Sequence, residues 1–268
     1  MSYGRDFILT LLTNDPKPAS AADFAGVDRI GVDLERIGKH ARQGQLKTWI
    51  SDHEEKDLPL LRKSISSARL FARCNPIHEG SAEELNRLIG YGVEVVMLPF
   101  FHTVAEAERF IRLLDGRAAA VLLVETAEAA DVVSKLCRIE DVREIHIGLN
   151  DLHLSLGWRS HFEVLASDYL DGLCKTILDA GLRLGVGGLG RAGDNDLPVP
   201  ADLVYAQYPR LKAGAALISR VFFRGESPVD MAREIGRLRE NLDHMNSLSV
   251  EALKEKQECL RELIRERL

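Results

Sequence analysis

The stretch IHIGLNDLHLSLG, residues 145–157, shows the local unit from which the fold is built. Its β-branched start is typical of a buried strand, Gly148 ends that strand, and an apolar helical pattern follows. Asn150 and Asp151 stand side by side at the junction. Because such pairs are also common at strand exits, Asp151 is either a turn residue or half of a metal site.

Similar strand-like runs alternate with helix-like segments along nearly the whole chain. The eight runs are FILTLLT (7–13), RIGVDL (29–34), ARLFARCN (68–75), VEVVMLPF (93–100), AAVLLVET (119–126), EIHIGLN (144–150), RLGVGGL (183–189) and AALISRVF (215–222). Thr103 with Glu106, and Ser81 with Glu84, predict capping boxes at two of the intervening helices. Eight such units predict an α/β fold, a closed (β/α)8 TIM barrel with a C-terminal helical extension. An open doubly wound sheet is the alternative, but no GxGxxG follows the first strand.

The sequence divides into a barrel, residues 1–226, and C-terminal helices, residues 227–268. The latter comprise the last barrel helix and a tail. Apolar residues recur at helical spacing, first strongly and then more weakly among charges: Met231, Ile235, Leu238, Leu242, Met245, Val250, Leu253, Leu260 and Ile264. The tail is either the frayed end of the last helix or an oligomerisation arm that docks on a neighbouring subunit.

Composition narrows the class of protein. The 268 residues are 46% hydrophobic and 28% charged, which is enough for a sizeable core, and the net charge is −6. The electrostatic footprint of a nucleic-acid-binding protein is missing, so no nucleic acid is expected as a partner. The 4 cysteines show no CxxC pairing, which fits reduced cytoplasmic thiols. No apolar run approaches the roughly 20 residues of a membrane span, so no membrane partner is expected.

The strand pattern also predicts charged residues inside the barrel. Alternate residues of a strand face opposite ways, and the outward set of a barrel must be apolar to seat the helices. This rule turns Asp33, Glu35, Arg73 and Glu125 inward, near the carboxyl ends of their strands. Barrel enzymes keep their chemistry at that end. Inward charges are costly unless they are paired or coordinate a metal.

Glu125 and Asp151 follow successive strands, so their carboxylates could share one hard cation. Two carboxylates, waters and a bidentate oxo acid make a plausible octahedral Mg²⁺ or Mn²⁺ site. Arg73 would then offer its planar donor fork to the substrate oxygens. Alternatively, Arg73 pairs with Asp33, Glu35 or Glu125 as a buried ion pair without a substrate role.

At these residues the sequence resembles the HpcH/HpaI aldolase and citrate lyase beta-subunit family, within the phosphoenolpyruvate/pyruvate barrel superfamily. The resemblance rests on the order and spacing of GVDRIGVDLERIGKHARQ (26–43), ARCNP (72–76), VVMLPFF (95–101), LLVETAEA (122–129), HIGLNDL (146–152), GVGGLG (185–190) and LISRVF (217–222). It implies a metal held by Glu125 and Asp151, with Arg73 on a pyruvate or enolate oxygen. It also implies a substrate carboxylate held by the turn of Gly148, Leu149, Asn150 and Asp151. Trimeric or hexameric homo-oligomers are common in the family.

One departure from the family concerns proton transfer. Hydroxy-acid aldolases of the family have a Glu-His pair after the second strand, whereas this chain has Glu35 followed by Arg36. The candidates for handling the proton of the substrate 4-hydroxyl are therefore Asp33, Glu35 and His78, with His153 as a further histidine near the site.

A basic run follows at the same barrel end. Arg36, with Lys39, His40 and Arg42, is either a solvated helix face or the reader of an anionic distal substrate group.

Three functions remain open from the sequence. The first is a metal-dependent class II carbon–carbon lyase that cleaves a 4-hydroxy-2-oxo acid to pyruvate, through its enolate, and an aldehyde. The second is a citrate-lyase-like coenzyme A thioester lyase or hydrolase. The third is a non-catalytic ligand-binding or assembly barrel, in which Arg36 marks lost proton chemistry.

Overall fold

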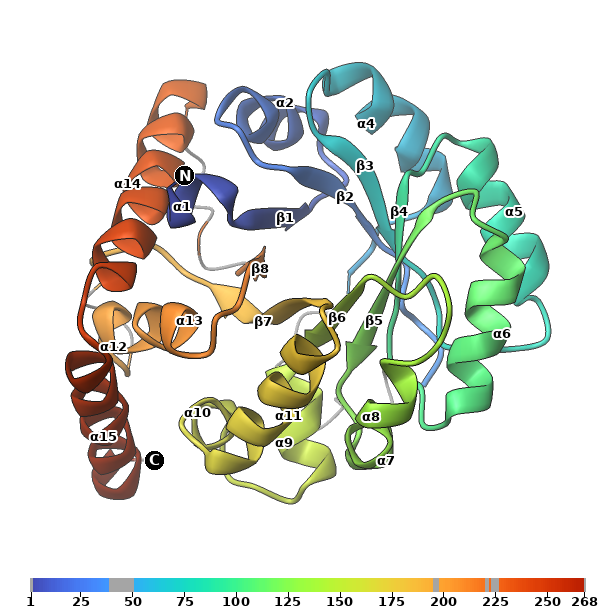
Figure 1. Ribbon diagram of the computed structural model, residues 1–268. Coiled ribbons are helices and arrows are strands. Elements are labelled where there is room, and N and C mark those ends of the chain that lie inside the picture. The colour runs from blue at the N-terminus through green and yellow to red at the C-terminus, as the bar shows by residue number, and fades with distance from the viewer. Residues whose placement is uncertain (1, 39–50, 195–197, 220–221, 223–226, 268) are drawn as a thin grey trace.

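A computed structural model of the chain describes residues 2–38, 51–194, 198–219, 222 and 227–267. Eight parallel strands close into a barrel in chain order, with β8 pairing back onto β1 (Figure 1). The strands are β1 (Ile8–Leu12), β2 (Arg29–Asp33), β3 (Arg69–Arg73), β4 (Val95–Leu98), β5 (Ala119–Val124), β6 (Glu144–Ile147), β7 (Arg183–Leu189) and β8 (Ala215–Ile218). The predicted (β/α)8 barrel and all eight predicted strands are confirmed.

Helices surround the strands on the outside of the barrel (Figure 1). They are α1 (Tyr3–Asp6), α2 (Pro16–Phe24), η1 (Glu55–Asp57), α4 (Leu58–Ser64), α5 (Ser81–Gly90), α6 (Val104–Leu114), α7 (Ala127–Asp131), α8 (Val133–Leu136), α9 (Leu149–Ser155), α10 (His161–Leu165), α11 (Asp168–Asp179), α12 (Ala201–Tyr205), α13 (Gln207–Arg210), α14 (Pro228–Asn246) and α15 (Val250–Arg267). Among the described residues no helix is long and apolar enough to cross a membrane.

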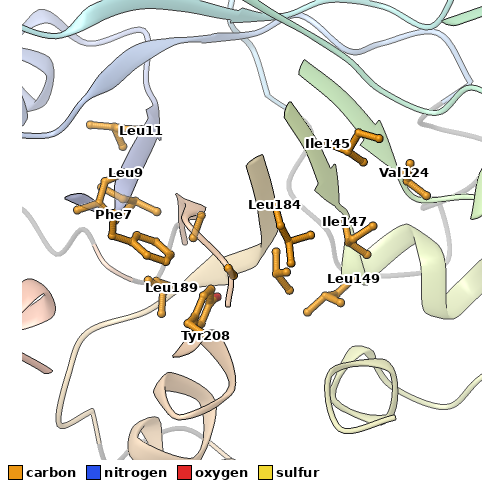
Figure 2. Close-up of a cluster of buried hydrophobic side chains, with 14 of the residues drawn as sticks. Phe7, Leu9, Leu11, Val124, Ile145, Ile147, Leu149, Leu184, Leu189 and Tyr208 are labelled. Atoms are coloured by element: carbon orange, nitrogen blue, oxygen red, sulfur yellow. The ribbon is translucent and has the colours of Figure 1, made fainter. Parts of the chain in front are cut away.

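The alternation of strand residues builds two apolar layers. The outward residues of the strands pack against the helices, and Figure 2 shows a part of this layer with Leu9, Leu11, Ile145 and Ile147. The inward residues fill the barrel itself as a separate cluster of Phe71, Val95, Met97, Val121 and Leu123. Such a filled interior leaves the carboxyl ends of the strands as the place for a site.

A buried ion pair occupies the amino-terminal end of the barrel. Arg29, at the start of β2, donates from both terminal nitrogens to the Glu144 carboxylate of β6, at 2.8 and 2.7 Å. Although burial alone would raise the pKa of Glu144, Arg29 holds that pKa below its ordinary value. The bidentate geometry satisfies both charges, which makes their burial tolerable. Interior charges therefore lie at both barrel ends, whereas the sequence analysis placed them only at the carboxyl ends.

The two predicted capping boxes have different outcomes. The Thr103 hydroxyl accepts from the Glu106 amide, and the Glu106 carboxylate accepts in return from the Thr103 amide. The box at Ser81 is wrong, because α5 begins at Ser81 itself after an N-cap at Gly80. The Glu84 carboxylate instead accepts from the backbone and side chain of Asn75. Tertiary contact with the loop after β3 has replaced the local cap.

The C-terminal extension packs back onto the chain's own barrel. α14 lies against α1 and α2, and α15 lies against α10, α12 and α13 (Figure 1). Leu260 and Ile264 of the weaker stripe are buried there, and Gln257 donates to the carbonyl of Ala166 at 3.0 Å. The stripe thus finds its partner within the chain, so its burial does not require a neighbouring subunit.

Candidate active site

Four carboxylates and one arginine gather where β2, β3, β5 and β6 end. Asp33 ends β2, with Glu35 two residues beyond it, and Arg73 ends β3 in register with Asp33. Glu125 follows β5, and Asp151 lies in the first turn of α9 after β6. All four acidic residues are buried, from 1% exposed at Asp33 and Glu35 to 8% at Asp151. The fold therefore brings together the residues that the strand pattern predicted to face inward.

Arg73 is held by Asp33. Its Nε and Nη2 donate to the two Asp33 oxygens at 2.9 and 2.7 Å, and its Nε lies 3.6 Å from Glu35 Oε2. Although burial alone would lower the pKa of the guanidinium, these carboxylates hold it well above its ordinary value. Among the described residues Nη1 has no hydrogen-bond partner, and Arg73 lines the cavity described below. The ion pair and a substrate role are therefore compatible.

Glu125 is a buried carboxylate that lies near two other carboxylates, those of Glu35 and Asp151. Its Oε1 accepts from the amide of Phe100 at 3.0 Å. Burial raises the pKa of Glu125 well above its ordinary value, and the neighbouring Glu35 and Asp151 carboxylates raise it further against the opposing effect of Arg73. A buried carboxylate in this position favours a proton or a bound cation.

Gly148 makes room for the Glu125 carboxylate. A Cβ added at Gly148 would lie 2.6 Å from Glu125 Oε2 and 2.8 Å from Glu125 Cβ. The backbone of Gly148 is an ordinary extended one, with φ −88° and ψ 97°, so the glycine is needed for close approach rather than for its conformational freedom. Gly148 at the end of β6 thus leaves space for the carboxylate of Glu125, and the first turn of α9 supplies the carboxylate of Asp151.

The donor set suits a hard divalent cation. Four carboxylates surround a single guanidinium, and oxygen is the ligand that Mg²⁺ and Mn²⁺ prefer. In the part of the chain that the structure describes, no three His, Cys, Asp or Glu side chains are arranged so that they could hold a metal ion together. A cation between Glu125 and Asp151 would therefore take its remaining oxygens from water and substrate, as a catalytic site requires.

A cavity of about 1300 Å³ opens above this cluster. Its floor includes Arg73, Glu125 and the turn Gly148, Leu149, Asn150 and Asp151. Gly148 is the N-cap of α9, so the first amides of that helix have no intrahelical partner. The predicted carboxylate-binding turn is thus in the cavity wall.

Four predicted residues do not line the cavity: Asp33, Glu35, His78 and Arg36. His78 accepts from the amide of Gly80 with its Nδ1 and donates through Nε2 to Glu84 at 2.9 Å. Arg36 donates from its side chain to the carbonyl of His53 at 2.8 Å, and neither it nor His78 lines the cavity. The rest of the basic run, Lys39, His40 and Arg42, lies outside the described residues.

Three histidines of the region have distinct environments. His146 is buried beside Gly187, whose carbonyl lies 3.1 Å from its Nε2, and burial lowers its pKa. Its ring fills the space that Gly185 leaves, since a Cβ there would lie 2.2 Å from His146 Nδ1. His153 and His161 both line the cavity. Sequence reasoning missed His161, because it belongs to the short helix α10, which carries no motif.

The fold and the position of the acidic cluster define a (β/α)8 barrel with a polar site at the carboxyl ends of its strands. No family model and no curated protein matches the chain by sequence. Solved structures do match: an HpcH/HpaI aldolase/citrate lyase family protein from Burkholderia cenocepacia J2315 has a TM-score of 0.62 at 17% identity, covering 91% of this chain and 96% of that one. The HpcH/HpaI aldolase from Desulfitobacterium hafniense DCB-2 has a TM-score of 0.57 at 14% identity and 81% and 86% coverage. The citrate synthase SbnG gives 0.58 at 13% identity and 87% and 91% coverage. The chain has the fold of these proteins, as its motifs predicted.

Proposed function

We propose that the chain is a member of the HpcH/HpaI aldolase/citrate lyase family and a divalent-metal-dependent carbon–carbon lyase. Its substrate would be a 4-hydroxy-2-oxo acid, cleaved to pyruvate and an aldehyde. One observation carries the proposal: the buried carboxylates of Glu125 and Asp151 lie beside Arg73 on the floor of a large cavity. The shared fold of the solved aldolase structures supports it.

Glu125 and Asp151 are the proposed ligands of Mg²⁺ or Mn²⁺. When bound, the cation supplies a Lewis acid for the 2-oxo group. The raised pKa of Glu125 supports this assignment, because a neighbouring cation would favour the charged carboxylate that burial disfavours.

Arg73 and the start of α9 would hold the substrate. Asp33 fixes the plane of the guanidinium by its two hydrogen bonds to Nε and Nη2, which leaves Nη1 available to a substrate in the cavity that Arg73 lines. There it donates to an enolate oxygen as negative charge develops. The amides of Leu149 and Asn150 would donate to the substrate carboxylate at the helix start.

The reaction balances without a further reagent. A base removes the proton of the 4-hydroxyl, the C3–C4 bond breaks to release the aldehyde, and its electron pair remains on C3 as the enolate. Protonation at C3 then gives pyruvate. His153 is the candidate base that lines the cavity, whereas Asp33, Glu35 and His78 do not. Asp33 and Glu35 are also paired with Arg73, and His78 is bound to Glu84. Assembly as a homo-oligomer, trimer or hexamer, and a cytoplasmic location stay predictions.

The second candidate function is a coenzyme A thioester lyase or hydrolase. The cavity volume of about 1300 Å³ favours it, because small-molecule pockets typically span about 300–1,000 Å³ and a small hydroxy acid would fill only part of this one. A screen of thioesters against hydroxy-oxo acids separates the two lyases. Absence of metal-dependent turnover with both classes would favour the ligand-binding or assembly barrel.

Proton NMR of pyruvate in D2O with the protein and Mn²⁺ tests the proposed lyase. Exchange of the methyl protons reports enolate formation without knowledge of the aldehyde. We expect exchange that EDTA abolishes, that Glu125→Gln and Asp151→Asn lack, and that Glu140→Gln, an exposed control, retains. Exchange at the parent rate in both site variants would exclude these residues as the metal ligands.

A further inference from the structure

The cavity extends far beyond the carboxylate cluster. A pyruvate unit occupies only a small part of about 1300 Å³, so the remaining volume is available to whatever substituent follows C4 of the substrate. The chemical nature of the cavity walls therefore bears on the substrate class.

One wall is apolar and begins next to Asp151. Leu154 follows Asp151 by three residues on α9, which places the two on one helix face about 4.5 Å apart along the axis. Leu154 lines the cavity and is 38% exposed, although it is a large hydrophobic residue. Phe162 and Leu165 of α10, which packs on α9, and Val204 of α12 also line the cavity. α10 and α12 both pack against α15.

Two rings, those of His161 and Phe162, also line the cavity next to these side chains. The His161 ring lies 4.1 Å from that of Phe162 and 6.2 Å from that of His153, centroid to centroid. Burial and the neighbouring His153 lower the pKa of His161 to about 4, so its imidazole is uncharged at neutral pH. The rings of His161 and Phe162 therefore offer flat, uncharged surfaces to a ligand.

Two of the charged residues that line the cavity lie across the barrel mouth. Asp15 and Lys17 stand at the start of α2, which follows β1, and β1 is opposite β5 in the closed strand order. They are therefore across the barrel mouth from Glu125. Arg191 also lines the cavity, and its Nε donates to the carbonyl of Phe222 at 2.7 Å.

We infer that the wall formed by Leu154, His161, Phe162, Leu165 and Val204 binds an apolar distal group, an alkyl chain or an aromatic ring attached at C4. This inference rests on the proposed function for the position of the 2-oxo acid end. The aldehyde product would accordingly be apolar rather than hydroxylated or acidic.

Binding of unreactive analogues tests the inference. We would titrate 2,4-dioxo acids with straight alkyl chains, from 2,4-dioxopentanoate to 2,4-dioxodecanoate, into the protein by calorimetry, with Mn²⁺ and again with EDTA. We expect Kd to fall about fourfold for each added methylene until the wall is covered. Leu154→Asp should reduce this gain to less than about twofold per methylene. Leu60→Asp, which alters a 55% exposed leucine on α4 away from the cavity, should retain it.

The outcomes separate the two proposals. If Kd does not depend on chain length while pyruvate exchange is intact, the apolar wall is refuted and the lyase stands. If chain length matters but exchange is absent, the apolar site stands in a protein of another function. Tighter binding of a hydroxylated analogue than of its alkyl counterpart would place the distal group near Asp15 and Lys17, which also overturns the inference. So would an equal chain-length gain in Leu154→Asp and the parent.

Discussion

Substitution of Gly148 by alanine tests how closely the site is packed. The added methyl group would lie 2.6 Å from Glu125 Oε2, 2.8 Å from Glu125 Cβ and 3.2 Å from Leu123 Cδ1. Because φ is −88° at this residue, alanine meets no backbone penalty, and the whole effect comes from the clash. Overpacking of this kind costs about 1–3 kcal/mol of the free energy of unfolding. A carboxylate displaced by about 1 Å should slow pyruvate proton exchange about 100-fold.

The matched control is Gly172→Ala in α11. A Cβ at Gly172 meets nothing within 4 Å, so alanine should raise the free energy of unfolding by about 0.5–1 kcal/mol through helix propensity and leave exchange at the parent rate. Urea denaturation and the NMR exchange assay measure both effects. A Gly148→Ala protein as stable and as active as the parent would refute the close packing of Gly148 against Glu125.

Three further predictions concern charge. Arg73→Ala should lower the free energy of unfolding, measured by urea denaturation, by about 3–5 kcal/mol, because it leaves Asp33 buried without its cation. Adding Asp33→Asn should recover part of this loss. A double variant less stable than Arg73→Ala would contradict this. The pKa of His161 in the folded protein is about 4, below its ordinary value of 6.5, so the free energy of unfolding that is present above pH 6.5 is lost as the pH falls toward 4. His161→Phe should flatten this decline when melting temperatures are measured as a function of pH. An unchanged profile would argue against the burial of His161. The raised pKa of Glu125 has the opposite effect on stability: in EDTA, the free energy of unfolding falls as the pH rises above 4.5. Glu125→Gln should therefore be more stable than the parent at pH 7. A less stable variant would show that burial does not destabilise the carboxylate.

The barrel could be predicted because its signal is local and repeated. Each strand carries an outward apolar set, such as Ile30 and Val32, that must meet a helix, and eight such runs leave few alternatives. The same alternation fixed the inward direction of Arg73 and Glu125. Asp151 followed from the strand exit at Gly148, since a turn after one strand lies beside the end of the next.

The remaining features depend on contacts that no local pattern encodes. Arg29 and Glu144 meet across the barrel from positions 115 residues apart. His78 is drawn to Glu84 by the shape of the loop after β3, and that loop also removes Glu84 from its expected cap. The apolar wall around His161 arises only when α9 and α10 pack together.

The packing of α15 has a consequence for the order of folding during synthesis. Gln257 and Arg261 of this helix both donate to the carbonyl of Ala166, the C-cap residue of α10. The helix α15, which supports α10 and the rings of His161 and Phe162, is thus translated after all eight strands of the barrel. A nascent chain could close its sheet while this flank still lacks support, and ribosome-bound intermediates should expose α10 to protease until α15 emerges.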